Sequence, residues 1–428
     1  MKKIFGVLMV LSFAAVDAQF TVNVQTEGTF TPREAYFYKL DGSKDILISK
    51  QEKKGDRWIL KVDEPYRGMM KAYFPESNYT VNFISENKDV SIKMNVANNR
   101  VSEVVYLDVS NKVMDEMQDR QMKREKLLPA FYELIQFYKP SQPFYAAVEK
   151  EIENLSRNYT VDATKHPFVD YYSTNYNKFL VTEAVKQQPS QQEIISFISN
   201  TNEMLETSSL LRPILISYLN SSQNTNMDVS VDNLLKAVNV ESPRGQTVLS
   251  ELIEIFDAYG MTGLKDKYLS QAKNLKCTIF SRLASTLETS AKTEIGSTFE
   301  NQQFVSPKNT TAKSLYDVKA DKKVVVFWSS GCSHCERDLP QFIPHYTAMK
   351  AKNIEIIGFS LDSEKAAFER AANNYPWIND TELRGWNSTY GDKYNVHATP
   401  TYFILDSNNK ILDKPNHVND VFEYLGLK

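Results

Sequence analysis

The feature that most constrains the fold is a pair of cysteines just beyond a strongly apolar run. Residues 322–328 read Lys-Lys-Val-Val-Val-Phe-Trp, a pattern typical of a strand that is buried on both faces. The sequence Cys332-Ser333-His334-Cys335 follows three residues later, and residues 336–350 have apolar side chains at helical spacing. A strand, a short turn with C-x-x-C and a helix together predict a redox-active cysteine pair on an α/β sheet.

The position of this pair at the start of a helix predicts different roles for its two thiols. A thiolate there faces free backbone N–H groups and the positive end of the helix dipole, so its charge is stabilised. We therefore expect Cys332 to be the exposed nucleophile and Cys335, one turn further in, to resolve the mixed disulfide. His334 lies between them, and we expect this titratable neighbour to favour the Cys332 thiolate further.

Other uses of the pair fit the sequence less well. Attachment of a c-type haem needs His directly after the second cysteine, where this chain has Glu336. A structural zinc site needs four ligands, and no second Cys/His pair follows at a useful spacing, so we expect no metal and no cofactor. An inert disulfide would close a loop too short to stabilise the fold much. An inert or purely redox-sensing pair remains the alternative.

The segment 324–335 resembles the active-site strand and turn of thioredoxin-fold proteins, and Pro340 matches the helix-kinking proline of that family. Residues 396–406 resemble its cis-proline segment, which implies that Pro400 is the cis residue with Thr399 beside it. The resemblance implies that this loop faces the cysteines and frames an extended substrate segment by strand addition.

Further similarities narrow the resemblance to one branch of the family. The lead-in 314–318, the run 357–362 and Trp377 are similar to the exported TlpA/ResA-like thiol-disulfide oxidoreductases. Two departures concern residues near the cysteines. Thioredoxins usually have a buried acid where this chain has Val326, and a Trp where it has Gly331.

These departures leave two mechanistic questions open at the level of sequence. Proton transfer must use another group, for which His334, Glu336 and water are the candidates. The Ser-His dipeptide is closer to the X-His pattern of oxidising or isomerising family members than to the Gly-Pro of reducing ones. Because a more stable thiolate raises the reduction potential, the direction of exchange stays undecided.

The chain ahead of this domain divides into a β-rich part and a helical part. Residues 19–108 alternate with period two between turn signals, which predicts an antiparallel β-sandwich or meander. Residues 109–295 have helical apolar spacing and few glycines, which predicts several helices. We therefore expect a multidomain α+β protein whose third domain, 296–428, has the α/β thioredoxin fold. The β part, on its strand rhythm and residues 55–58, resembles an uncharacterised domain fused to such thioredoxins in Bacteroidota.

Two expectations concern the helical part in detail. Ser190 followed three residues later by Glu193 is a capping box, which predicts that a helix begins there. Cys277, the third cysteine, lies in an apolar segment and is expected to pack into the core as a small hydrophobic residue.

The N-terminus has the pattern of a secretory signal. A basic Met1-Lys2-Lys3 precedes an apolar stretch over residues 4–15 and small residues near Ala18. We expect residues 1–18 to be removed and the mature protein to begin near Gln19. The protein would then be exported, periplasmic and soluble. Thiols in such a compartment persist only where something keeps them reduced.

Charge and motifs together define the predicted function. The chain has 50 Lys+Arg against 53 Asp+Glu, a net charge of −3, which excludes the basic footprint of a nucleic-acid binder. The sequence predicts an exported thiol–disulfide oxidoreductase that exchanges disulfides with protein clients and with an unidentified redox partner. The alternative is a client-binding or scaffold protein whose thioredoxin module tethers or senses redox state without turnover, because the front parts carry no visible chemistry.

Overall fold

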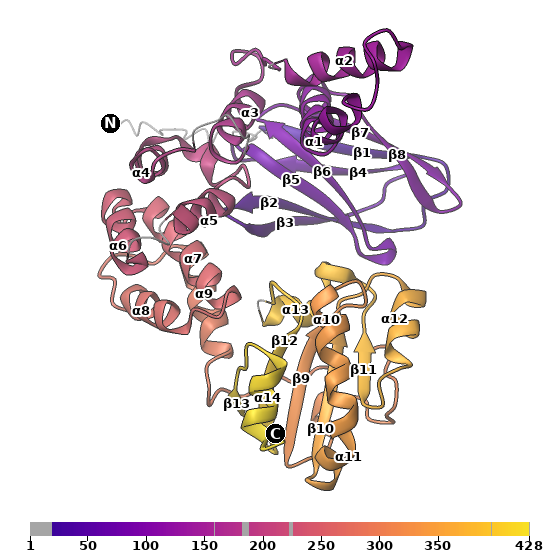
Figure 1. Ribbon diagram of the computed structural model, residues 1–428, viewed down its shortest axis with the longest axis vertical. Coiled ribbons are helices and arrows are strands. Elements are labelled where there is room, and N and C mark those ends of the chain that lie inside the picture. Colours follow the sequence, from indigo (N-terminus) through magenta and orange to yellow (C-terminus); the bar gives the residue numbers. More distant parts are fainter. Residues whose placement is uncertain (1–18, 158, 182–187, 222–225, 395, 428) are drawn as a thin grey trace, which may run out of the picture. The chain divides into compact units, whose positions relative to one another are not determined.

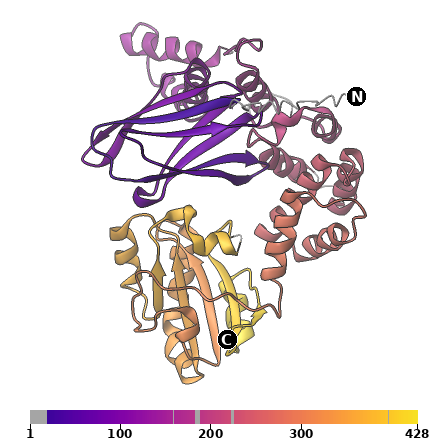
Figure 2. The ribbon, with the colours of Figure 1, turned by 180° about the vertical axis from the view of Figure 1, so that it is seen from behind.

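The structure is a computed structural model that describes residues 19–427 except 158, 182–187, 222–225 and 395. The expected signal segment, residues 1–18, lies outside the described residues. Contacts divide the described chain into two compact units. The first consists of the residues up to Leu40 together with Asp45–Glu76 and Thr80–Tyr176, and the second of Asp41–Lys44, Ser77–Tyr79 and the chain from Asn177 onward. Figures 1 and 2 show the elements of both from opposite sides.

The β-rich part of the chain forms two four-stranded sheets (Figure 1). In spatial order the first contains β4 (Arg57–Val62), β1 (Phe20–Glu27), β7 (Val90–Ala97) and β8 (Arg100–Tyr106). The second contains β3 (Lys44–Glu52), β2 (Glu34–Asp41), β5 (Arg67–Phe74) and β6 (Tyr79–Glu86). The pairs β1–β4, β7–β8 and β2–β5 are antiparallel as expected, whereas β1 and β7 run parallel.

The two sheets pack face to face through the side chains that the period-two pattern places inward. Along β1 the side chains of Phe20, Val22 and Val24 are buried and alternate with partly exposed ones. Trp58 of β4 and Phe74 of β5 come from different sheets, and their ring centroids are 4.7 Å apart in an edge-to-face contact. The contact joins the sheets into a sandwich-like core.

Three helices follow the strands, namely α1 (Val109–Ile135), α2 (Pro143–Ser156) and α3 (Pro167–Phe179). Asp108 caps α1, because its carboxylate accepts the backbone N–H of Asn111 at 2.9 Å. Although α1 has 27 residues, neither it nor any other helix of the described ranges combines the length and apolarity needed to cross a membrane.

The second unit begins with a helical region before its sheet. Its helices are α4 (Gln191–Asn200), α5 (Leu211–Ser221), α6 (Met227–Val238), α7 (Pro243–Ala258), α8 (Thr262–Lys273) and α9 (Ser281–Lys292). The capping box predicted at Ser190 is confirmed, since its hydroxyl accepts the N–H of Glu193 and the Glu193 carboxylate accepts the N–H of Ser190. Helix α7 is buried from Gly245 to Phe256, so it is the centre around which α5, α6, α8 and α9 pack.

The burial of Cys277 and the division of the helices between the two units differ in how they compare with the sequence-based expectations. Cys277 is half-buried rather than a core residue, because it lies in the irregular connection between α8 and α9, where the amide of Gln246 donates to its sulfur at 3.2 Å. Helices α1 and α2 belong to the first unit and α4–α9 to the second, with the division inside α3. The domain boundaries at 108/109 and 295/296 therefore stay a prediction.

The C-terminal part of the second unit is a five-stranded sheet covered on both faces. Its strands in spatial order are β11 (Ile378–Thr381), β10 (Ile354–Ser360), β9 (Lys322–Trp328), β12 (Thr401–Asp406) and β13 (Ile411–Asp413). Its helices are α10 (Ser333–Asp338), α11 (Ile343–Ala351), α12 (Lys365–Ala372), α13 (Thr389–Lys393) and α14 (Val418–Leu425). Strands β9, β10 and β11 are parallel, and β12 runs antiparallel to both β9 and β13.

Successive residues of β9 point into two separate cores, as the continuous apolar run predicts. Val324, Val326 and Trp328 pack with side chains of α10, α11, α12 and α14. Val325 and Phe327 pack on the opposite face with α13 and with the lead-in segment at Phe299. The predicted fold class is therefore confirmed: antiparallel β-sheets at the N-terminus, helices in the middle and a mixed α/β domain of thioredoxin type at the C-terminus.

Candidate active site

The two motif cysteines lie where the central strand passes into a helix. Strand β9 ends at Trp328, and α10 begins at Ser333 with Cys332 as its N-cap residue. The sulfur of Cys332 accepts the backbone N–H of Cys335 at 3.4 Å, which is the bond that a capping side chain normally makes. Cys332 is half-buried and Cys335 is buried. The thiol at the helix start is thus the one that another molecule can reach.

A buried carboxylate from the neighbouring strand fixes the turn before Cys332. Asp362 follows β10 and accepts the backbone N–H of Ser330 at 3.0 Å. It also accepts the hydroxyls of Ser329 at 3.1 Å and Ser330 at 2.7 Å. A third hydroxyl, from Ser360, donates to the same carboxylate at 2.7 Å. These bonds hold the turn against the sheet, so that Cys332 has a defined position.

The cis-proline segment meets the cysteines because β12 pairs with β9. Thr401 lies opposite Phe327 in this antiparallel pair, which places the residues just before β12 beside the end of β9. The Thr399–Pro400 peptide bond is cis. The thiol of Cys332 donates to the carbonyl of Thr399, with Sγ and O 3.0 Å apart. The structure thus brings together Cys332, Thr399 and Pro400, and Cys335 lies one turn behind.

The surroundings of the two thiols shift their pKa values in opposite directions. Burial disfavours the charge of Cys332, but hydrogen bonds from the Thr399 side chain and from the N–H groups of Cys335 and His334 outweigh it and lower the pKa of Cys332. Burial dominates at Cys335 and raises the pKa of its thiol to about 12. In the reduced pair, the thiol of Cys332 therefore ionises more readily than that of Cys335.

His334 contacts a second side chain of α10, and its effect as a titratable neighbour of Cys332 stays a prediction. Its Nδ1 lies 3.1 Å from a guanidinium nitrogen of Arg337, one turn further along α10. A guanidinium can only donate, so this ring nitrogen is the acceptor in the contact. The backbone N–H of His334 is one of the groups that lower the pKa of Cys332.

Three side chains near the cysteines were missed by the sequence reasoning. Arg337 donates to the carboxylate of Asp338 at 2.7 Å, and Asp338 is buried although it is charged. Tyr402 of β12 is buried, and its hydroxyl has no hydrogen-bond partner among the described residues. Burial, together with the nearby Asp338 and Cys335, raises the pKa of Tyr402.

A sequence signal for two of these residues exists in retrospect. Asp338 follows Cys335 by three residues, so both fall on the same face of a helix. Tyr402 is the one hydroxyl-bearing side chain in the apolar strand run 402–405. Within the ranges that the structure covers, no group of three or more His, Cys, Asp or Glu side chains is arranged to hold a metal ion.

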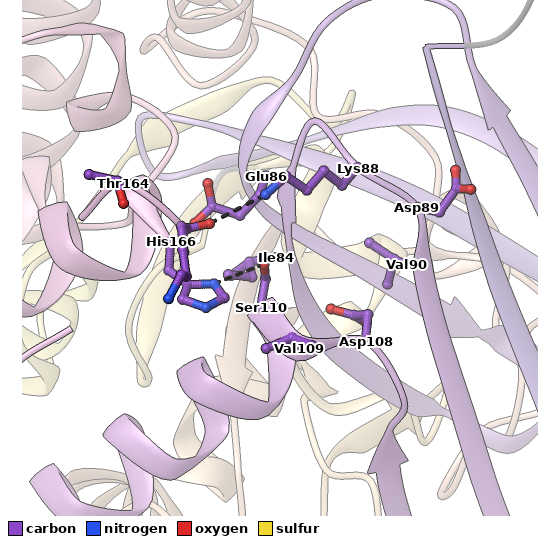
Figure 3. Close-up of a pocket in the computed structure, with 11 residues that line it drawn as sticks. Ile84, Glu86, Lys88, Asp89, Val90, Asp108, Val109, Ser110, Thr164 and His166 are labelled. Atoms are coloured by element: carbon purple, nitrogen blue, oxygen red, sulfur yellow. Dashed lines mark hydrogen bonds between the residues drawn. The ribbon is translucent and has the colours of Figure 1, made fainter. Parts of the chain in front are cut away.

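Apart from the cysteine site, a cavity of about 500 Å³ lies within the first unit (Figure 3). It contains a hydroxyl–imidazole pair, because the Ser110 Oγ lies 3.2 Å from Nδ1 of His166. The Glu86 carboxylate closes the start of α3 by accepting the N–H of Phe168 at 2.9 Å. Asp108 caps α1, as described above. Glu86 and Asp108 thus accept N–H groups at helix starts, and the third acid of the cavity, Asp89, accepts the backbone N–H of Thr21 at 2.7 Å, so all three carboxylates have structural roles.

The C-terminal domain matches known proteins in sequence. Residues 321–411 match a family model described as thioredoxin-like. The chain is 27% identical over 100 residues to the thiol-disulfide oxidoreductase ResA of Bacillus cereus and 24% identical over 102 residues to that of Bacillus subtilis. Each match covers 23% of this chain and 57% or 54% of the relative. The chain therefore spans little more than half the length of these curated relatives.

Solved structures with a similar fold come from Bacteroides among other bacteria. The thioredoxin domain of a thiol-disulfide oxidoreductase from Bacteroides vulgatus is 24% identical and covers 31% of this chain and 96% of its own, with a TM-score of 0.29. A thioredoxin-like protein from Bacteroides caccae is 16% identical and covers 58% of this chain and 97% of its own, with a TM-score of 0.36.

Proposed function

We propose, from the thioredoxin-like domain that ends this chain, that the protein is an exported thiol–disulfide oxidoreductase acting on protein clients. The observation that carries the proposal is the division of labour between two thiols at one helix start. Cys332 is accessible and has a lowered pKa, whereas Cys335 is buried and has a pKa raised to about 12. An exchange enzyme needs this pairing of a reactive attacking thiolate and a protected resolving thiol.

The exchange proceeds in two steps. The Cys332 thiolate attacks one sulfur of a client disulfide, so that a bond forms between Cys332 and the client while the client's own S–S bond breaks. The released client thiolate takes up a proton. Cys335 then loses its proton and attacks Cys332, which forms the Cys332–Cys335 disulfide and releases the second client thiolate. Two electrons pass from the cysteine pair to the client, and the reverse sequence oxidises a client dithiol.

The remaining site residues assist these steps. A client segment adds its backbone alongside Thr399 and Pro400, next to the reacting sulfur. Asp338 is a buried carboxylate on the Cys335 face of α10, and it serves as the proton acceptor for Cys335 where Val326 replaces the acid of other thioredoxins. The Asp362 carboxylate keeps the turn in place during both steps.

Trapping of the mixed disulfide tests this function. A Cys335→Ala variant cannot resolve the intermediate, so it should accumulate covalent protein adducts through Cys332 that dissociate on addition of dithiothreitol. The adducts are measured by non-reducing electrophoresis and mass spectrometry. A Cys277→Ala variant is the matched control and should behave as the unaltered protein.

Turnover assays separate the proposed enzyme from the scaffold alternative. Cys332→Ser should abolish both disulfide reduction and dithiol oxidation. A scaffold would show no adducts in the Cys335→Ala variant, and its function would survive replacement of both motif cysteines. If Cys332→Ser equals the unaltered protein in both assays, the exchange function is excluded.

A further inference from the structure

A small cavity adjoins the cis-proline loop inside the second unit. Its volume is about 120 Å³. One wall comes from the end of α7, the start of α8 and the turn between them, and the other walls come from Tyr394, residues 396–398, 400–403 and 414–416 of the thioredoxin-like domain. The helical region therefore contributes directly to the surface beside the exchange site.

The cavity lies on the path that a client segment takes to reach Cys332. Ala398 and Pro400 line the cavity. The residue between them, Thr399, has its carbonyl 3.0 Å from the sulfur of Cys332. An extended chain advances about 3.3 Å per residue, so a client running along this loop reaches the cavity within a few residues of its cysteine.

The cavity has more positive than negative side chains. The Nζ atoms of Lys265 and Lys414 each lie 3.3 Å from the same oxygen of Asp257. Among the described residues, the other acid that pairs with one of these ammonium groups is Asp266, which is largely exposed and lies 4.0 Å from Lys265. Partial burial lowers the pKa of His397, which also lines the cavity, to about 4, so its imidazole is neutral near pH 7.

The ammonium groups of Lys265 and Lys414 thus share the single carboxylate of Asp257. Burial lowers the pKa of Lys414 despite the attraction of Asp257. A partly desolvated cation of this kind is stabilised by a second anion, and the exposed fractions of the Lys265 and Lys414 side chains, 19% and 21%, leave room for one to approach.

We propose that this cavity is a client-recognition site, in which Lys414 and Lys265 bind a carboxylate side chain of the protein segment whose cysteine reacts with Cys332. The occupant is an extended segment with Asp or Glu within a few residues of its reactive cysteine. This inference rests on the proposed exchange function and assigns the helical region a role in it, because Asp257 and Lys265 belong to α7 and α8.

Peptides activated as 2-pyridyl disulfides test the proposal with the full-length protein. The Cys332 thiolate attacks the peptide sulfur, the peptide–pyridyl S–S bond breaks, and 2-thiopyridone leaves with a proton and is followed by absorbance. Two peptides are compared that differ only in Glu or Gln beside the cysteine, at each of several positions. For the Cys335→Ala variant, the Glu peptide should react about three- to tenfold faster at its best position at low salt, and this ratio should fall as salt is added.

Variants then locate the source of the preference. Lys414→Gln should bring the Glu/Gln rate ratio to about one, whereas Lys414→Arg should retain it because the positive charge stays. Lys267 is the matched control, since it lies on α8 and pairs with Asp228 and Asp232 outside the cavity, and Lys267→Gln should keep the preference. The inference is overturned if the Glu/Gln rate ratio is near one when both Lys265 and Lys414 are present. It is also overturned if the ratio is unchanged in the Lys414→Gln variant.

Dipyridyl disulfide distinguishes failure of this inference from failure of the proposed function. If Cys332 reacts with this small uncharged disulfide no faster than free cysteine does, the exchange function itself is wrong. If it reacts rapidly but the peptides show no preference, the exchange function stands and the recognition site is excluded.

Discussion

Cys332 and Cys335 are three residues apart, yet their surroundings favour opposite protonation states. The first sulfur receives backbone hydrogen bonds at a helix start, and the second is enclosed by the core side chains around β9. Because a thiolate is the reactive species, the microenvironment and not the residue type decides which sulfur attacks.

The pH dependence of alkylation tests this assignment. In the reduced protein, the iodoacetamide reaction of Cys332 should rise with a midpoint below the ordinary thiol pKa, because its folded-state thiolate is stabilised. Cys335 should stay unreactive until the pH approaches about 12. The two rates are followed by mass spectrometry in the Cys335→Ala and Cys332→Ala variants, with denatured protein as the control. A lower midpoint for Cys335 than for Cys332 would contradict the assigned roles.

Buried ion pairs connect helix α7 to its neighbouring helices. Glu251 and Glu254 are buried on α7 and pair with Arg282 of α9 at 2.8 Å each. Arg212 of α5 also pairs with both carboxylates. Each carboxylate is thus shared by two guanidinium groups, and these bonds tie three helices together.

Removal of one buried partner should destabilise this region strongly. We expect Arg282→Ala to lower the free energy of unfolding by about 3–5 kcal/mol, because two carboxylates lose their innermost cation. Lys267→Ala on the surface of α8 is the control and should cost about 0–1 kcal/mol. Urea unfolding followed by circular dichroism measures both. Equal midpoints for the two variants would show that the cluster adds little.

The ion pairs of Glu251 and Glu254 with Arg212 and Arg282 should also make the free energy of unfolding depend on pH in the acidic range. Burial disfavours the charge of Glu254, but Arg282 outweighs it and lowers the pKa of Glu254 to about 2. A carboxyl group whose pKa is lower in the folded state contributes stability that is complete above its unfolded pKa and is lost as the pH falls toward the folded value. The contribution of Glu254 should therefore decline between about pH 4.5 and pH 2, and Arg282→Ala should flatten this decline.

At the scale of the whole molecule, the proposed chemistry occupies the second unit, and the first unit has a structural core with its own cavity.

The expected export of the chain can be measured independently of the chemistry. When the full-length gene is expressed in a bacterium with a Sec pathway, the mature form should begin at Gln19, as the N-terminal signal pattern predicts. Intact mass of the periplasmic fraction checks this, and a product that retains Met1 would exclude cleavage at Ala18.

Much of the C-terminal domain could be predicted because its signals are local. The apolar run of β9 and the cysteine spacing each depend on a few consecutive residues, and so does the Ser190 capping box in the helical region, because propensity and periodicity act within such windows. The same locality explains the error over Cys277: an apolar stretch is visible in sequence, but whether it enters the core depends on distant partners.

The sequence by itself determined the order of the elements, the position of the cysteine pair at a helix start and the proline that lies opposite it. Only the tertiary structure decided which groups hydrogen-bond the Cys332 sulfur, which carboxylate fixes the turn and which lysines share Asp257. The physical reason is that pKa values, burial and cavities depend on atoms brought together across long separations. Cys332 and Thr399 are 67 residues apart in the chain, and Asp257 and Lys414 are 157 apart.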